Sequence, residues 1–98
     1  MARYRLSFQA RTELSEIWVY VAENSGIDNA NNLNRQFLER FPLLAEFPQM
    51  GRARPELAPD VRSFPINNFV VLYRSTDYGI EILHIVHGRR QIETLFPQ

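Results

Sequence analysis

Four arginines and one histidine in the second half of the chain carry the side chains best suited to binding an anion. They are Arg62, Arg74, His87, Arg89 and Arg90, and a guanidinium fork matches the geometry of a phosphate or a carboxylate. All 11 basic residues are arginines, and 11 acidic residues cancel their charge. Because nucleic-acid binders usually carry a basic excess, we expect a local anion or carboxylate site and no direct sequence-specific DNA binding. The alternative is that these arginines pair with neighbouring carboxylates on a solvated surface.

His84 and His87 are the only histidines of the chain. Three residues apart on a strand, they would point to opposite faces and could not chelate one metal ion, so no metal or cofactor is expected. His84 is predicted to share a face with Ile80, Ile82 and Val86 and to be a hydrogen-bonded, semi-buried side chain. His87 ends the same apolar run and is the better candidate for an acid or base.

Two helices are predicted in the first half of the chain. Residues 3–8 alternate polar and apolar, as in a half-buried strand. From Ala10 to Glu23 the apolar residues recur at spacings of three and four, which predicts an amphipathic helix that stops at Gly26. Glu13 and Glu16 are expected to be solvated charges on this helix.

A second helix should follow at once, with Asp28 as its N-cap, and pack antiparallel against the first. Its apolar stripe comprises Ala30, Leu33, Phe37, Phe41 and Leu44. Pro42 removes a backbone donor and therefore predicts a kink or break near Phe41. Beyond it lies a proline-rich connection, in which Phe47 and Met50 are expected to anchor the loop onto the core.

Three apolar runs joined by short links predict consecutive antiparallel hairpins: Val61–Ile66, Phe69–Ser75 and Gly79–His87. The last run is apolar on both faces and should form a central strand, and the N-terminal strand should join the same sheet. The fold class is therefore α+β: an N-terminal strand, an antiparallel helical hairpin, a three-stranded antiparallel meander (β-α-α-β-β-β) and a short C-terminal segment.

Composition predicts one globular domain over residues 1–98, because 45% of the residues are hydrophobic and 12% aromatic. No cysteine is present, which excludes disulfides and thiolate chemistry and fits a reducing, cytoplasmic setting. The first residues alternate in polarity, and no apolar run approaches the ~20 residues that span a bilayer. We therefore expect neither a secretory signal nor a membrane-spanning segment.

Short sequence matches run along nearly the whole chain in a fixed order. They are Tyr4-Arg5-Leu6-Ser7, a helix carrying Ala10, Leu14, Ile17, Trp18 and Tyr20, then Phe47-Pro48, Met50-Gly51-Arg52, Arg62-Ser63-Phe64-Pro65, Val71-Leu72-Tyr73-Arg74, Ile80-Glu81-Ile82-Leu83 and His87-Gly88-Arg89. In this order and spacing the chain resembles the ParE/RelE superfamily of bacterial toxins, and the ParE branch more than the RelE branch.

The resemblance implies the toxin of a type II toxin–antitoxin system. A ParE-like toxin is not an enzyme but inhibits growth by binding and poisoning DNA gyrase, and a cognate ParD-like antitoxin neutralises it. The antitoxin wraps the toxin with a flexible segment, for which Trp18, Tyr20 and Phe37 are the candidate contacts. Core packing is the alternative for Trp18. The target contacts would come from the anion-binding set defined above.

Two other functions stay open at this point. A RelE-like, ribosome-dependent mRNA endonuclease would use His87 as acid or base and the arginines to bind phosphate. Such nucleases usually carry a tyrosine or histidine near the C-terminus, whereas the only aromatic residue between Arg89 and Gln98 is Phe96. The chain would then depart from the nuclease pattern. The third possibility is a relative that binds an antitoxin but is no longer toxic.

Overall fold

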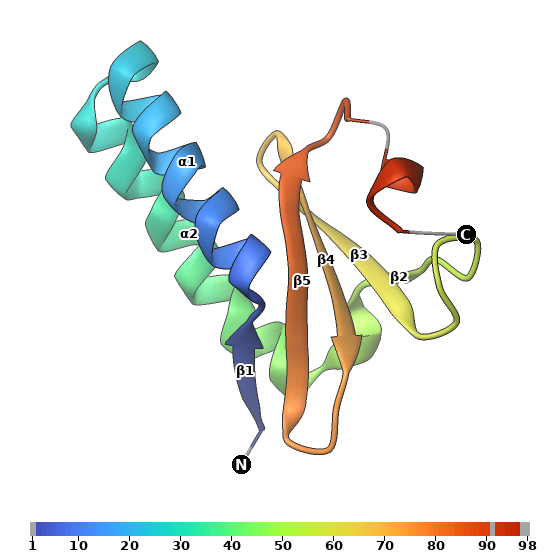
Figure 1. Ribbon diagram of the computed structural model, residues 1–98. Coiled ribbons are helices and arrows are strands. Elements are labelled where there is room, and N and C mark those ends of the chain that lie inside the picture. The colour runs from blue at the N-terminus through green and yellow to red at the C-terminus, as the bar shows by residue number, and fades with distance from the viewer. Residues whose placement is uncertain (1, 91, 97–98) are drawn as a thin grey trace.

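A twisted sheet of five strands carries the helical hairpin on one face (Figure 1). The computed structural model describes residues 2–90 and 92–96. In chain order the elements are β1 (Arg3–Leu6), α1 (Phe8–Ser25), α2 (Ile27–Glu46), η1 (Pro48–Met50), β2 (Arg52–Ala53), β3 (Val61–Ile66), β4 (Phe69–Ser75), β5 (Gly79–His87) and η2 (Ile92–Leu95). The predicted α+β class and the order of its elements are confirmed.

The strands lie side by side in the order β1-β5-β4-β3-β2. The predicted meander forms through antiparallel pairing of β3 with β4 and of β4 with β5, and β1 joins the sheet parallel to β5. One strand was not predicted from the sequence. It is β2, which has only two residues, Arg52 and Ala53, and pairs with β3. A strand this short has no alternating pattern to detect.

The two helices begin earlier than their apolar patterns indicate. Phe8 was expected in the first strand, but it begins α1 and is 84% exposed. Ser7 caps this helix, because its Oγ accepts a hydrogen bond from the Ala10 N–H at 3.0 Å. Gly26 joins the helices with a φ of +94°, and Asp28, the expected cap, lies inside the first turn of α2. Side-chain capping therefore decides where α1 starts.

Pro42 does not break the second helix, so that prediction was wrong. The helix α2 continues through it to Glu46. Proline removes the hydrogen bond to the carbonyl four residues earlier, at Leu38. Both Leu38 and Pro42 lie on the exposed side of α2, where water can satisfy the freed carbonyl. Burial of Phe41 and Leu44 on the opposite side holds the helix in place.

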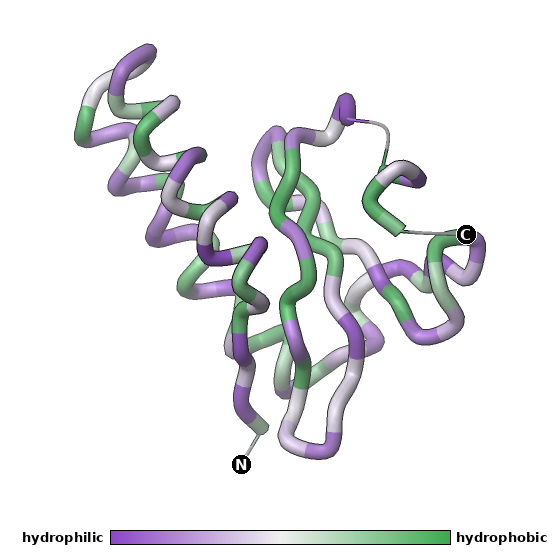
Figure 2. Tube along the Cα trace, in the orientation of Figure 1, coloured by the Kyte–Doolittle hydropathy of each residue, from purple (hydrophilic) through white to green (hydrophobic). Residues whose placement is uncertain are grey.

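Both faces of the central strands are covered. The larger core fills the space between the hairpin and the sheet and contains Leu33, Phe37, Phe41, Tyr73 and Ile82 among others. A smaller cluster covers the other face, under the 54–60 connection and η2, and comprises Leu57, Val61, Leu72, Val86 and Ile92. Apolar residues accordingly concentrate along β4 and β5 in Figure 2. The expected central, doubly covered strand is thus confirmed as β5.

A buried tyrosine holds the connection between α2 and the sheet. Tyr73 donates a hydrogen bond from its hydroxyl to the Pro48 carbonyl at 2.5 Å and accepts one from the Gly51 N–H at 2.9 Å. A Cβ at Gly51 would lie 2.2 Å from the Tyr73 hydroxyl oxygen, so the chain can approach only without a side chain there. Phe47 and Met50 were expected to be the anchors, but they are 58% and 44% exposed. The hydrogen bonds of Tyr73 anchor the connection to the sheet instead.

We predict that Tyr73→Phe destabilises the domain by about 1–3 kcal/mol, because it leaves the Gly51 N–H and Pro48 carbonyl without their partner. Burial raises the pKa of Tyr73 above its usual 10.0. The native state therefore binds the phenolic proton more tightly than the unfolded chain, and this stability is lost as the pH rises through the raised pKa. Urea denaturation at neutral pH measures the effect. Tyr20→Phe, at an exposed site, is the control, and equal midpoints for the two variants would contradict the prediction.

A candidate binding groove between the helical hairpin and the sheet

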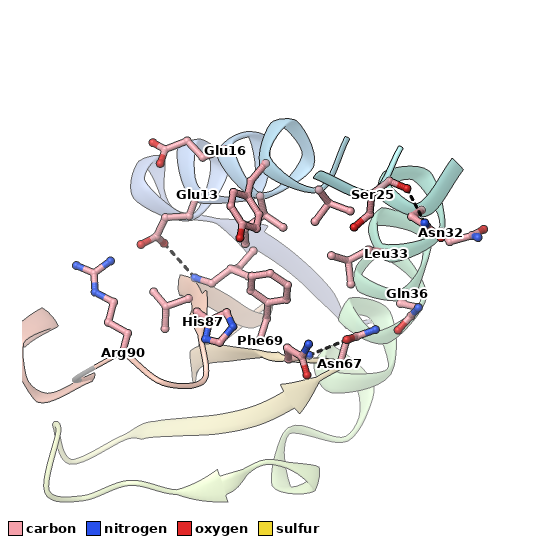
Figure 3. A pocket seen from close by; sticks show the side chains of 17 residues that line it. Glu13, Glu16, Ser25, Asn32, Leu33, Gln36, Asn67, Phe69, His87 and Arg90 are labelled. Carbon is pink, nitrogen blue, oxygen red and sulfur yellow. Dashed lines mark hydrogen bonds between the residues drawn. The ribbon is translucent and has the colours of Figure 1, made fainter. Parts of the chain in front are cut away.

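The helical hairpin diverges from the sheet towards the α1–α2 connection (Figure 1). A groove lies between the hairpin and the end of β5 (Figure 3). Its volume is about 860 Å³, at the upper end of the range for clefts that hold small ligands. Residues of α1 and α2 form one side, and the β3–β4 turn with the end of β5 forms the other. The lining residues are Glu13, Glu16, Ile17, Tyr20, Val21, Ser25, Asn29, Asn32, Leu33, Gln36, Asn67, Asn68, Phe69, Ile85, Val86, His87 and Arg90.

The groove combines an apolar floor with polar walls. Side chains that belong to or pack against the main core form the floor: Ile17, Val21, Leu33, Phe69 and Ile85. The carboxylates of Glu13 and Glu16 extend from α1, and the cationic or titratable His87 and Arg90 come from the exit of β5 (Figure 3). Within the described residues, Glu16, His87 and Arg90 form no ion pair with one another. Opposite charges thus remain available at two rims of an apolar trough.

Glu13 ties α1 to the sheet at the edge of this groove. Its Oε1 accepts a hydrogen bond from the Ile85 N–H at 3.0 Å, and its Oε2 lies 3.2 Å from His84 Nδ1. The Glu13 side chain is only 18% exposed. The expectation of a solvated charge was therefore wrong for Glu13, although Glu16 is exposed as expected. Sequence periodicity could not reveal that a strand edge lies opposite this helical position.

An irregularity in β5 changes the face that His84 occupies. Leu72 of β4 pairs with His84, but the next residue, Tyr73, pairs with Ile82, so Leu83 is an extra residue on β5. As a result Ile82 belongs to the core under the helices and Val86 to the cluster on the opposite face. The prediction that His84 shares one face with both was wrong. Its semi-buried, hydrogen-bonded state is confirmed by its Glu13 partner.

His87 is exposed at the end of β5, at the mouth of the groove. Its Nδ1 accepts a hydrogen bond from the Arg89 N–H at 3.2 Å, and its ring packs edge-on against Phe69 with centroids 5.6 Å apart. Because Nδ1 acts as an acceptor, a neutral ring carries its proton on Nε2. Arg89 and Arg90 are also exposed beside it. The β5 exit thus presents a histidine and two arginines to a partner.

The five basic candidates do not all lie in one patch, and the alternative of pairing with a neighbouring carboxylate holds for Arg74. Arg74 is opposite Glu81, and Phe69, five residues earlier on β4, is opposite His87, so the two ends lie about 17 Å apart. Arg74 forms an ion pair with Glu81 at 2.9 Å. Arg62 donates from its guanidinium to the Gly51 carbonyl at 2.8 Å, on the Tyr73-anchored connection. Among the described residues, only the β5 exit gathers several basic groups of the candidate set that have no ion-pair partner.

The three candidate partner contacts on the helices have different positions. Tyr20 lines the groove and is 64% exposed. Trp18 is half-buried outside the groove lining, and its Nε1 donates a hydrogen bond to the Asn31 Oδ1 at 3.0 Å. Phe37 is fully buried, so it cannot contact a partner and that assignment was wrong. The amides of Asn32, Gln36 and Asn67 line the groove without having been predicted, because only the fold brings them together.

Within residues 2–90 and 92–96, no group of histidine or acidic side chains is arranged to hold a metal ion. In the same part of the chain, no helix combines the length and apolar character that crossing a bilayer requires.

Comparison with known proteins assigns the chain to a family. A model of the ParE toxin of type II toxin–antitoxin system, parDE, matches residues 4–92. The chain belongs to the ParE toxin family. Toxin ParE1 of Mycobacterium tuberculosis is a relative with 30% identity, covering 94% of this chain and 95% of its own. Toxin ParE1 of Caulobacter vibrioides is 31% identical over 89% of this chain and 90% of its own.

The ParE fold is supported independently by a solved structure. A chain from the chromosomal ParDE TA system of P. aeruginosa superimposes with a TM-score of 0.75, over 89% of this chain and 96% of that one. Its sequence identity is 22%, so the likeness concerns the fold. This chain is thus a ParE toxin of a type II toxin–antitoxin system, and the resemblance seen in its sequence is confirmed.

For this ParE-family chain we predict that Glu13→Ala lowers the free energy of unfolding by about 1–3 kcal/mol, because the Ile85 N–H loses its acceptor. Glu13→Gln keeps an acceptor oxygen and should recover part of the loss. Urea denaturation compares both with Glu16→Ala, which removes an exposed carboxylate one turn along α1. A loss as large for Glu16→Ala would mean that helix charge, and not the contact with β5, carries the effect.

Proposed function

We propose that this ParE-family toxin inhibits growth by binding DNA gyrase, and that a ParD-like antitoxin neutralises it by placing a segment in the groove. Its main support is the combination of family membership with an apolar, open groove beside an exposed cluster of basic groups. The groove and the cluster share His87 and Arg90. A segment bound in the groove would therefore cover part of the surface that the toxin offers to its target.

The groove has the composition of a docking site for a peptide. Its floor is apolar, and its rims carry amides and charges that would fix the orientation of a bound segment. Tyr20 stands at the rim with most of its surface exposed, and a tyrosine can bury a large area at little entropic cost. These features support an antitoxin segment with apolar anchors as the occupant.

The basic cluster His87, Arg89 and Arg90 is the proposed contact with gyrase. Its guanidinium groups could form charge-assisted hydrogen bonds with carboxylates or phosphates of the target. Arg62 and Arg74 remain secondary candidates, because both already have partners: the Gly51 carbonyl and Glu81, respectively. Such binding would not require chemistry by the toxin.

The alternative function, a RelE-like mRNA endonuclease, is favoured by one observation. His87 is an exposed, titratable group beside two arginines, which is part of what RNA cleavage requires. Primer extension on cellular transcripts after induction separates the functions, because only a nuclease yields defined internal ends. A chain that leaves both growth and transcripts unchanged would instead be a relative without toxicity.

We predict that Tyr20→Ala weakens binding of a co-expressed ParD-like antitoxin by about 10-fold or more, because it removes a large anchor at the groove rim. Val19→Ala is the matched control, since Val19 is 49% exposed but does not line the groove. Titration calorimetry with each purified variant measures the affinities. Equal losses for both variants would place the antitoxin on another face of α1.

We predict that the double variant Arg89→Glu/Arg90→Glu loses gyrase inhibition by about 10-fold or more, because it reverses the charge of the contact surface. A supercoiling assay with purified gyrase, with and without antitoxin, measures it. Arg11→Glu/Arg40→Glu makes the same change in net charge at exposed positions of the hairpin and serves as the control. Undiminished inhibition by folded Arg89→Glu/Arg90→Glu protein would remove the β5 exit from the target contact.

A further inference from the structure

The turn that carries Arg89 and Arg90 is closed by a side chain as well as by the backbone. His87 ends β5, and its carbonyl accepts a hydrogen bond from the Arg90 N–H at 3.0 Å, as in a β-turn over residues 87–90. Its imidazole adds a second bond, because Nδ1 accepts from the Arg89 N–H at 3.2 Å. A side-chain acceptor that binds the N–H two residues further on is the arrangement of an Asx-turn, in which asparagine or aspartate normally supplies the acceptor. The imidazole of His87 takes that place here.

The base of this turn is fixed to the neighbouring strand. The Gly88 N–H donates to the Asn68 carbonyl at 2.9 Å, and a Cβ at Gly88 would lie only 3.3 Å from that carbonyl oxygen. Phe69 is opposite His87 on β4 and packs edge-on against its ring, with centroids 5.6 Å apart (Figure 3). Beyond this base, the bond to His87 Nδ1 is the only hydrogen bond that Arg89 forms within the described residues. The imidazole therefore links the end of the turn to its anchored base.

The two ring nitrogens of His87 distinguish a positioning role from a role in contact or proton transfer. Nδ1 is occupied by the Arg89 N–H, and among the described residues nothing forms a hydrogen bond with Nε2. An imidazole that contacts the target or transfers a proton would therefore act through Nε2, whereas one that holds the turn acts through Nδ1. The doubly protonated ring of a general acid would carry a hydrogen on Nδ1, which would remove the acceptor that Arg89 uses. The geometry thus suits a neutral ring that holds the backbone.

We propose that His87 is a positioning residue of the target contact: its Nδ1 holds the 87–90 turn in the conformation that presents Arg89 and Arg90 to anionic groups of the target. Both arginines are exposed, and neither has an ion-pair partner within the described residues. Fixing the backbone in advance lowers the entropic cost of binding, because fewer bonds must be immobilised when the target is met. This inference rests on the proposed binding of gyrase and assigns His87 a role that it exerts through the two arginines.

The test uses two amides that each replace one ring nitrogen. The Oδ1 of asparagine lies as far along the side chain as Nδ1, whereas the Oε1 of glutamine lies one bond further out, near the place of Nε2. We expect His87→Ala and His87→Gln to need at least about fivefold more toxin for half-inhibition of purified gyrase in a supercoiling assay, and His87→Asn to recover most of that loss.

Each other pattern in the supercoiling assay would overturn the proposal for a different reason. Recovery by His87→Gln but not by His87→Asn would mean that Nε2 contacts the target. Loss of inhibition in both amide variants would mean that the imidazole itself is required, as in proton transfer. Undiminished inhibition by all three variants, including His87→Ala, would mean that this side chain does not hold the contact surface.

Exchange of the Arg89 amide with water, measured by NMR on the purified toxin without gyrase, tests the turn separately from the target. This amide should exchange at least about fivefold more slowly in the wild type and in His87→Asn than in His87→Ala and His87→Gln. Equal exchange in all four proteins would refute the positioning role. If exchange followed the expected order but the wild-type toxin left gyrase uninhibited, the proposed target would be wrong and the turn itself would be confirmed.

Discussion

The backbone edge of β5 is the constraint on which the rest of the molecule depends. The strand has nine residues, but its neighbour β1 has only four, so half of the edge must find other partners. Ser7 donates from its hydroxyl to the Leu83 carbonyl, and Glu13 accepts from the Ile85 N–H. These two side chains fix the start of α1 against the sheet. Beyond Glu13, no helical side chain forms a hydrogen bond with the backbone of β5 within the described residues, and the groove begins there.

The hydrogen-bond and ion-pair partners of the arginines also separate them by role. Arg62 binds a carbonyl of the connection that Tyr73 also holds, so its charge serves the join between the hairpin and the sheet. Arg74 is exposed and pairs with the half-buried carboxylate of Glu81; such a surface pair contributes little to stability but makes Arg74 less available for binding. Arg89 and Arg90 follow the last strand and have no comparable partner in the described chain. All these residues are arginines, so residue type does not separate a structural arginine from one that is available for binding. What separates them is whether the side chain lies near the connection between α2 and the sheet.

Sequence periodicity predicted the elements well because each buries one face or both. The stripe from Ala30 to Leu44 is buried as expected, and the three apolar runs form β3, β4 and β5. Prediction failed where a single contact across the chain decides the outcome. The extra residue at Leu83, the Glu13 bond to Ile85 and the Tyr73 anchor all join residues more than 20 positions apart or depend on register. Phe37 shows the converse error, since a position on the buried stripe was also assigned to a partner.

The groove and the β5 exit are adjacent consequences of one strand end, and this bears on how a toxin of this shape could be silenced. If the antitoxin segment lies in the groove, it contacts His87 and Arg90, so it covers part of the proposed target contact directly. Neutralisation would then require no change in the fold of the toxin, because occupancy alone excludes the target. If the free antitoxin segment is flexible, the energetic cost of ordering it on binding falls on the antitoxin. The apolar floor of the groove suits that demand, since burial of apolar side chains of the segment can offset the cost of ordering it.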